Sequence, residues 1–136
     1  MTKITGSCLC GAVQIEAEVD QPQTMSCFCA DCQRCTGSSC ATFVAVPIPA
    51  MKLQGETKGY TKKSDEDRNV TRHFCPECGS QLFSEVEVMP GVRFVKIGVL
   101  DSNSDFAPGV AIWTDSKPAW AETGEVAATF PRNPGG

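Results

Sequence analysis

The sequence predicts a mostly β domain built around cysteines, and three observations support this. Short apolar stretches recur along the chain, separated by Gly and Pro, as in proteins made of many short strands. Only residues 31–36 read as a helix, which Gly37 would end. Nine of the 136 residues are cysteine, most of them in C-x-C or C-x-x-C pairs. We expect residues 1–136 to form one domain, with a core of about residues 4–122 and a frayed carboxy-terminal tail.

The strands are expected where the hydrophobic pattern is clearest. In residues 11–19, GAVQIEAEV, every second residue from Val13 to Val19 is apolar, which is the pattern of a half-buried strand. Residues 92–100, VRFVKIGVL, are read as apolar on both faces and are therefore expected at the centre of a sheet. The charged run at 62–72 is interpreted as a solvated loop or hairpin, with substrate gating as the alternative. Further strands are predicted at 41–46, 51–53, 57–61, 69–74, 81–88 and 110–114.

Charge and cysteine usage argue against several classes of protein. Twelve basic and sixteen acidic residues give a net charge of −4, which disfavours a general nucleic-acid-binding role. No apolar run approaches the roughly 18 residues of a transmembrane helix, and the amino terminus does not read as a signal peptide. We therefore expect a cytoplasmic protein that contacts no membrane. In that reducing compartment, clustered cysteines more often bind metal or perform chemistry than form disulfides.

Four cysteines are expected to form one closed metal site. Cys8 and Cys10 end a strand-like segment, where residues i and i+2 point to the same face. Cys75 and Cys78 flank a tight turn in the sequence CPECG, in which Gly79 takes a conformation that a Cβ would hinder. Two such pairs can supply a tetrahedral Cys₄ site, and zinc is favoured over iron as its ion. Because four thiolates leave no open position, this site is expected to be structural.

Three more cysteines, Cys27, Cys29 and Cys32, lie within six residues. Three thiolates on one ion leave a fourth position for water, a substrate thiol or another cysteine, and such openness is typical of catalytic zinc. Cys35 lies one helical turn after Cys32 and could close the site. The spacing is compatible both with an open site of three cysteines and with a site closed by Cys35.

Four blocks of the sequence occur together in a family-specific order: GSCLCGAV at 6–13, CFCADCQRCTGS at 27–38, FCPECGS at 74–80 and IWTDSKPAW at 112–120. Together they resemble the glutathione-dependent formaldehyde-activating enzyme family, also called the CENP-V/GFA domain. The resemblance implies an Mss4-like fold of coiled antiparallel sheets around a structural zinc. It also implies a second, looser zinc whose remaining position serves a substrate thiol or water. By resemblance, the structural ligands are Cys8, Cys10, Cys75 and Cys78, and the second set is Cys27, Cys29 and Cys32.

The resemblance further implies a zinc-dependent carbon–sulfur lyase or synthase acting on thiol–aldehyde adducts. The family's named activity joins glutathione to formaldehyde and gives S-hydroxymethylglutathione, so the expected partner is a small thiol such as glutathione. The alternative is a non-catalytic zinc-binding module for protein interaction, with both ions structural. The chain carries Phe28 where the family often has histidine, and Gln33 where it often has arginine. Arg34, the next residue, is a candidate for pairing with a substrate carboxylate.

Overall fold

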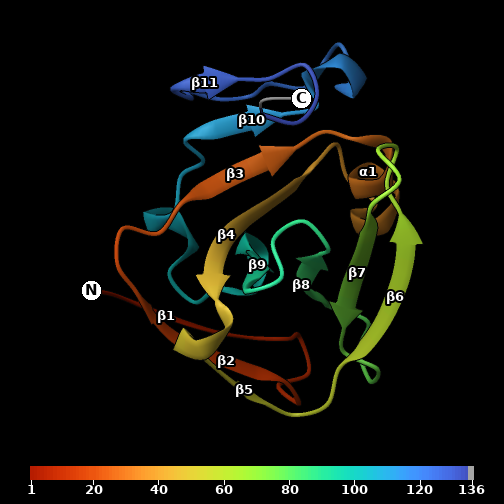
Figure 1. Cartoon of the computed structure of the whole chain (residues 1–136). Coiled ribbons are helices and arrows are strands. Elements are labelled where there is room, and N and C mark those ends of the chain that lie inside the picture. Colours follow the sequence, from red (N-terminus) through yellow and green to blue (C-terminus); the bar gives the residue numbers. More distant parts are fainter. Residues whose placement is uncertain (135–136) are drawn as a thin grey trace.

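The computed structural model describes residues 1–134 (Figure 1). The single α-helix in this part of the chain, α1, spans Ala30–Thr36 and ends at Gly37, as predicted. None of the described helices has the length and apolar character needed to cross a membrane. Short 3₁₀ turns occupy Ile48–Ala50, Ile97–Val99, Asn103–Asp105 and Thr114–Ser116. The strands are β1 (Thr2–Ser7), β2 (Gln14–Val19), β3 (Thr24–Cys27), β4 (Ala41–Pro47), β5 (Met51–Gln54), β6 (Lys58–Lys63), β7 (Asn69–Phe74), β8 (Gln81–Val86), β9 (Val92–Lys96), β10 (Val110–Ile112) and β11 (Ala128–Thr129).

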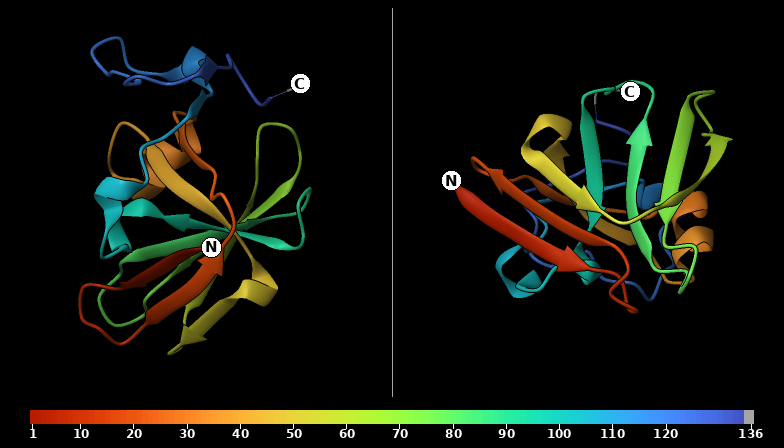
Figure 2. Two further views of the ribbon diagram at one scale, coloured as in Figure 1. Left: turned by 90° about the vertical axis from the view of Figure 1, so that its left-hand side faces the viewer. Right: turned by 90° about the horizontal axis from the view of Figure 1, so that it is seen from below.

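The strands form two sheets, which confirms the mostly β prediction. A three-stranded sheet has the order β1-β2-β5, and a larger sheet has the order β11-β10-β3-β4-β9-β8-β7-β6. Neighbouring strands are antiparallel except at β10, which is parallel to both β3 and β11. The larger sheet is strongly coiled, and the three-stranded sheet lies against one side of it (Figure 2).

Alternating side chains of the larger sheet pack into two separate hydrophobic cores, one on each face. In β4, Val44 and Val46 face the three-stranded sheet, whereas Ala41 and Phe43 face α1. Of residues 92–100, predicted to be central, Val92–Lys96 forms β9 between β4 and β8, whereas Ile97–Val99 forms a 3₁₀ turn. The core between the sheets includes Ile4, Val13, Ile15, Val44, Val46, Leu82, Phe83 and Val95, and the core beneath α1 includes Cys27, Cys32, Ala41, Phe43, Phe94, Ile112 and Trp113.

The carboxy-terminal tail is more ordered than expected. Beyond residue 122, where we expected the core to end, Ala128–Thr129 forms β11 and pairs with β10. The backbone N–H of Trp113 donates to the Arg132 carbonyl at 3.1 Å, and its indole N–H donates to Asn133 Oδ1 at 2.9 Å. The tail is therefore bound to the edge of the larger sheet as far as Asn133, while residues 135–136 lie outside the described part of the chain.

Candidate functional site

The structure brings the first predicted set of four cysteines together. The sulfurs of Cys8, Cys10, Cys75 and Cys78 all lie within 4.8 Å of one another. Cys8 Sγ is 3.6 Å from Cys10 Sγ, and Cys10 Sγ is 3.8 Å from Cys75 Sγ. A tetrahedron with Zn–S bonds of ~2.3 Å has S–S edges of roughly 3.8 Å. The four sulfurs thus have the chemistry and the spacing that one zinc ion requires.

The way Cys8 and Cys10 converge differs from our expectation. They lie in the turn between β1 and β2, not on a strand, and Cys8 is buried whereas Cys10 is exposed. Gly11 has a φ of 82°, a left-handed conformation that favours glycine. The Val13 N–H donates to Cys8 Sγ at 3.2 Å. A turn, and not the two-residue repeat of a strand, therefore points both sulfurs at one place.

On the opposite side of this cluster, the turn between β7 and β8 presents Cys75 and Cys78. The predicted role of Gly79 is confirmed by its φ of 78°, and its N–H donates to the Cys75 carbonyl at 2.8 Å. Ser80 Oγ lies 3.2 Å from Cys78 Sγ and accepts the Leu9 N–H at 3.0 Å. Hydrogen bonding from Ser80 lowers the pKa of Cys78 to about 5. Sequence reasoning missed Ser80, because a serine after a turn glycine carries no signal of its own.

The second predicted set, Cys27, Cys29 and Cys32, also converges, with all three sulfurs within 4.8 Å of one another. Cys27 ends β3, and Cys29 caps α1 by accepting the Cys32 N–H on its sulfur at 3.3 Å. Cys27 and Cys32 are buried against Phe43, Phe94 and Trp113. The strand end and the first turn of the helix together position this three-sulfur cluster.

The cluster stabilises a thiolate on Cys29. Hydrogen bonds from the Cys27 and Cys32 thiols lower the pKa of Cys29 to about 2, and the Cys32 N–H and the nearby Arg72 act in the same direction. The same hydrogen bond to Cys29, together with burial, raises the pKa of Cys27. A deprotonated sulfur is the form that binds metal and attacks carbonyl carbon.

Cys35 does not join this cluster. Its sulfur donates to the Cys32 carbonyl oxygen at 3.5 Å, and among residues 1–134 no fourth ligand atom lies within the distance that groups the other three. Cys40 lies further along, with Sγ 3.8 Å from Thr42 Oγ1. The protein therefore presents three sulfurs at this site.

Two cations that sequence reasoning missed face the second cluster from the larger sheet. Lys96 of β9 is buried, at 7% exposure, and its ammonium donates to Ser84 Oγ at 3.2 Å. Burial lowers the pKa of Lys96, although the Cys32 and Cys35 sulfurs oppose this effect. Burial also acts to lower the pKa of Arg72 on β7, but the neighbouring Cys32 and Cys35 sulfurs outweigh it and raise the pKa. The cluster thus lies in a positive environment.

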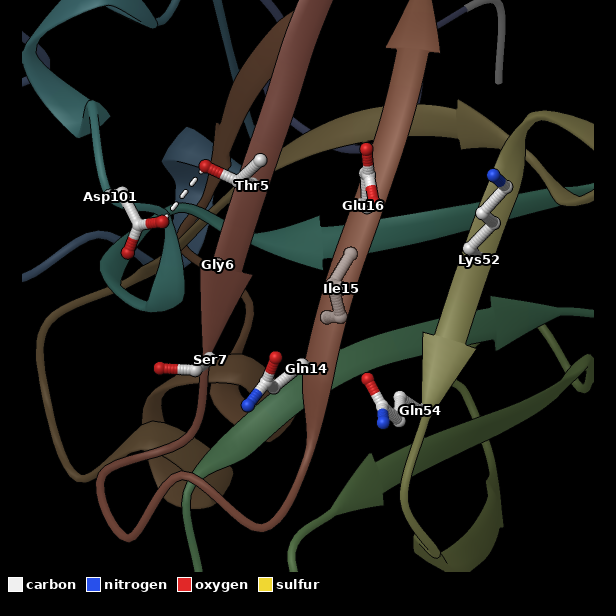
Figure 3. Close-up of a pocket in the computed structure, with 9 residues that line it drawn as sticks. All are labelled: Thr5, Gly6, Ser7, Gln14, Ile15, Glu16, Lys52, Gln54 and Asp101. Carbon is white, nitrogen blue, oxygen red and sulfur yellow. Dashed lines mark hydrogen bonds between the residues drawn. The ribbon is translucent and has the colours of Figure 1, made fainter.

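Two of the hollows in the described structure bear on the site. One, of about 530 Å³, lies at the end of α1 and is lined by Cys35, Thr36, Ser38, Cys40, Ala41, Thr42, Gly79, Gln81, Lys96, Ile97 and Gly98. The other, of about 430 Å³, lies on the three-stranded sheet and is lined mainly by polar side chains such as Gln14, Glu16 and Lys52 (Figure 3). It contains no cysteine. The first hollow therefore exposes two cysteines, Cys35 and Cys40, that belong to neither cluster.

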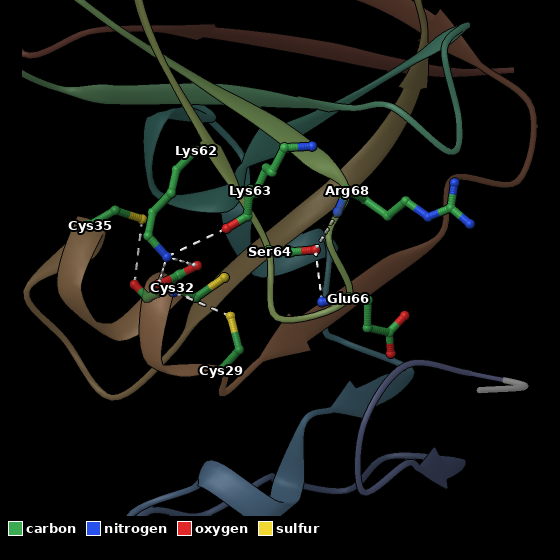
Figure 4. Close-up of polar contacts among 9 residues, drawn as sticks. Cys29, Cys32, Cys35, Lys62, Lys63, Ser64, Glu66 and Arg68 are labelled. Atoms are coloured by element: carbon green, nitrogen blue, oxygen red, sulfur yellow. Dashed lines mark hydrogen bonds and ion pairs between the residues drawn. The ribbon is translucent and has the colours of Figure 1, made fainter.

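The charged run at 62–72 forms a hairpin that contacts α1 through an ion pair. It forms the end of β6, a turn, and the start of β7. The Lys62 ammonium lies 3.0 Å from both carboxylate oxygens of Asp31 at the start of the helix. In the turn, Ser64 Oγ accepts the N–H groups of Glu66 and Arg68 (Figure 4). The hairpin thereby packs its tip beside the cysteine-bearing segment.

Four further side chains, those of His73, Phe28, Gln33 and Arg34, make structural contacts or point to solvent. His73 stacks on Phe83 with ring centroids 4.6 Å apart, and its Nε2 lies 2.7 Å from Glu85 Oε1. Phe28 is 1% exposed and packs in the core, while the Gln33 side-chain amide donates to the Phe28 and Ser116 carbonyls. Arg34 is exposed on α1. None of these four side chains belongs to either cysteine cluster.

Comparison with known proteins gives three findings. A family model described as glutathione-dependent formaldehyde-activating enzyme matches residues 3–116. The chain is 26% identical over 83 residues to a Schizosaccharomyces pombe protein named only as an uncharacterized lyase. That match covers 61% of this chain and 58% of the yeast protein, so the chain spans less than two thirds of this relative.

A crystal structure of a Rhodobacter sphaeroides protein shares the fold, with a TM-score of 0.60 at 20% identity. The superposition covers 93% of this chain and 98% of that one. The family match spans most of the sequence and includes all seven cysteines of the two clusters. The chain therefore belongs to the glutathione-dependent formaldehyde-activating enzyme (GFA) family.

Proposed function

We propose that the protein is a zinc-dependent carbon–sulfur lyase or synthase that acts on adducts of a thiol and an aldehyde. The observation that carries this proposal is the three-sulfur cluster of Cys27, Cys29 and Cys32, which has no fourth protein ligand among residues 1–134. Three protein ligands with one free position are typical of catalytic zinc, whereas four are typical of structural zinc. Membership of the GFA family and the lyase name of the yeast relative support the same reaction class.

The two clusters would have different roles. Cys8, Cys10, Cys75 and Cys78 would hold a structural zinc, because four sulfurs complete a tetrahedron. Cys27, Cys29 and Cys32 would hold the second zinc, which when bound stabilises the thiolate form of a substrate thiol. The buried cysteines and the aromatic side chains of Phe43, Phe94 and Trp113 would exclude water from the reacting atoms.

The proposed reaction is an addition in which all atoms balance. The substrate sulfur attacks the aldehyde carbon, a C–S bond forms, and the C=O π electrons move to the oxygen. That oxygen takes a proton equivalent to the one the thiol loses, and the product is a hemithioacetal. With glutathione and formaldehyde as substrates the product is S-hydroxymethylglutathione. The lyase direction is the reverse. The protein contributes mainly by holding the thiolate and orienting the aldehyde near it.

The test compares two cysteine variants of the same segment. Cys29→Ser should lose the second zinc and the exchange between glutathione and formaldehyde, while circular dichroism stays native. Cys35→Ser should keep two zinc ions per chain and nearly full activity, because its sulfur lies outside the cluster. Zinc content is measured per chain, and exchange rates are measured by NMR against the fast uncatalysed addition. If Cys35→Ser loses the second zinc as completely as Cys29→Ser does, the site is closed, and a non-catalytic interaction module becomes the better interpretation.

A further inference from the structure

Two cations beside the second cluster have no carboxylate partner. Lys96 is 7% exposed, and among the described residues its ammonium donates one hydrogen bond, to the neutral hydroxyl of Ser84. The ammonium also lies 5.3 Å from the centre of the Phe43 ring. Arg72 is partly buried, and its buried Nε has no hydrogen-bond partner in the described part of the chain. Within residues 1–134, neither side chain forms an ion pair with a carboxylate.

A buried ammonium such as that of Lys96 needs a compensating negative charge, and a partly buried guanidinium such as that of Arg72 is stabilised by one. Removing an ammonium or guanidinium group from water is strongly unfavourable unless an opposite charge lies close to it. A lysine ammonium has three donors and an arginine has five, so one neutral hydroxyl leaves most of this capacity unused. An anion bound on this face of the sheet would therefore stabilise the two cations.

Strand register places both cations on the face that carries the second cluster. Arg72 is paired with Ser84 across β7 and β8, and Ser84 is paired with Phe94 across β8 and β9. Lys96 follows Phe94 by two residues, so the two share a face, and Lys96 is paired with Phe43 on β4. Phe43 and Phe94 pack against Cys27 and Cys32. The Cys32 and Cys35 sulfurs act on both cations and raise the pKa of Arg72, while the charge of Arg72 also acts on Lys96.

The number of charges indicates what the open position accepts. Three thiolates and one divalent ion leave a single negative charge at the cluster. Lys96 and Arg72 add two positive charges. With a neutral fourth ligand such as water, the site therefore has a net charge of +1. An anionic fourth ligand brings the sum to zero, which a water-excluded environment favours.

We propose that Arg72 and Lys96 are specificity-determining residues that make the open position of the second cluster select an anionic fourth ligand, a thiolate, over a neutral one. The proposal rests on the proposed function of the Cys27, Cys29 and Cys32 cluster as a metal site open to substrate thiol. Lys96 also lines the 530 Å³ hollow together with Cys35. Its positive charge is therefore accessible from that hollow as well as facing the cluster side of the sheet.

The test measures ligand choice separately from catalysis. The protein is loaded with cobalt(II), whose visible absorption reports a change of ligand, and is titrated with 2-mercaptoethanol, which binds as a thiolate, or with neutral imidazole. Lys96→Met and Arg72→Met remove each charge at similar side-chain length, and Arg68→Met removes an exposed charge in the β6–β7 turn as the matched control. We expect each of the first two changes to weaken thiol binding roughly tenfold to a hundredfold and to leave imidazole binding unchanged. Arg68→Met should leave both affinities unchanged.

Charge-conserving variants guard against a merely structural effect. Lys96→Arg and Arg72→Lys should restore most of the preference for thiol over imidazole, including where a methionine variant loses metal from the second cluster. An unchanged preference in both methionine variants would overturn the proposal, and so would wild-type protein that binds neither ligand. If the wild type shows the charge-dependent preference but no hemithioacetal formation, the proposed function fails while this inference stands.

Discussion

Ser80 connects the two halves of the first cysteine cluster through a single hydroxyl. It contacts Cys78 Sγ from the β7–β8 turn and accepts the Leu9 N–H from the β1–β2 turn. Outer hydrogen bonds of this kind orient metal ligands, and their loss commonly weakens metal binding 10–100-fold. We predict that Ser80→Ala lowers the zinc affinity of the first cluster by about that factor.

Competition with a coloured chelator measures this affinity. Ser104→Ala, at an exposed position in a 3₁₀ turn, is the matched control and should leave the affinity unchanged. Equal zinc affinities for Ser80→Ala and wild type would show that the two turns converge without help from this hydroxyl.

Phe28 stands between two cysteines of the second cluster, yet its side chain belongs to a core. It is 1% exposed and packs with Ala111 and Ala121. We predict that Phe28→His, which places an imidazole among apolar groups, costs about 2–4 kcal/mol of unfolding free energy. Phe28→Leu should cost less than Phe28→His, because it stays apolar.

Urea unfolding of the zinc-loaded variants measures the cost. Zinc stoichiometry should stay at the wild-type value in Phe28→Leu. If Phe28→His is as stable as wild type and binds additional metal, the position contributes to the metal site and not to packing.

At the residue scale, the sequence predicted which cysteines form each cluster but not which other side chains surround them. Short spacings such as C-x-C and C-x-x-C limit how far apart two sulfurs can lie, so both cysteine groups could be predicted before the structure. Lys96 and Arg72 could not, because a cation within a strand pattern reads as solvent-exposed until register shows which face it shares. In both cases the strand pairing brings them to the cysteine-bearing face.

At the scale of elements, the β6–β7 hairpin is tied to α1 by the Lys62–Asp31 ion pair. The Lys62 side chain is 49% exposed and that of Asp31 is 22% exposed, so water screens the attraction. We predict that Lys62→Ala changes the unfolding free energy by less than about 1 kcal/mol and leaves the zinc content unaltered. Chemical denaturation and metal analysis test this. A larger loss of stability, or loss of the second zinc, would show that the hairpin is needed to hold the helix in place.

The elements that were predicted and those that were missed differ in physical character. β2 and β7 have clear alternation or clear boundaries, and β7 was predicted with the bounds that the structure shows. β3 has only four residues, and β11 has two, so neither contains enough periods for a pattern to emerge. Their backbone hydrogen bonds come from neighbours far along the chain, and β11 exists because β10 offers a free edge.

At the scale of the whole molecule, the two clusters tie together different lengths of chain. The first joins the turn of the three-stranded sheet to the β7–β8 turn of the larger sheet, whereas the second gathers residues 27–32 of one local segment. Closing a long loop removes more freedom from the unfolded chain than closing a short one. Binding energy at the first cluster therefore becomes folding energy to a much greater degree than binding energy at the second.

We therefore predict that chelation removes the two ions in separate steps. The second cluster, with three protein ligands on a local segment, should release its ion first while circular dichroism stays native. Removal of the first ion should then unfold the protein. Cys78→Ala should reproduce this second step, with loss of the first zinc and of most of the stability, whereas Cys29→Ser should reproduce only the first step. The measurement pairs zinc release with circular dichroism over one chelator titration. Simultaneous loss of both ions with global unfolding would contradict the separation, and a Cys78→Ala protein with near-wild-type melting temperature and full zinc content would contradict the structural role itself.

The core between the sheets, which includes Val44, Val46 and Phe83, remains apolar in either variant. Any stability that survives in Cys78→Ala thus measures what this core contributes without the metal.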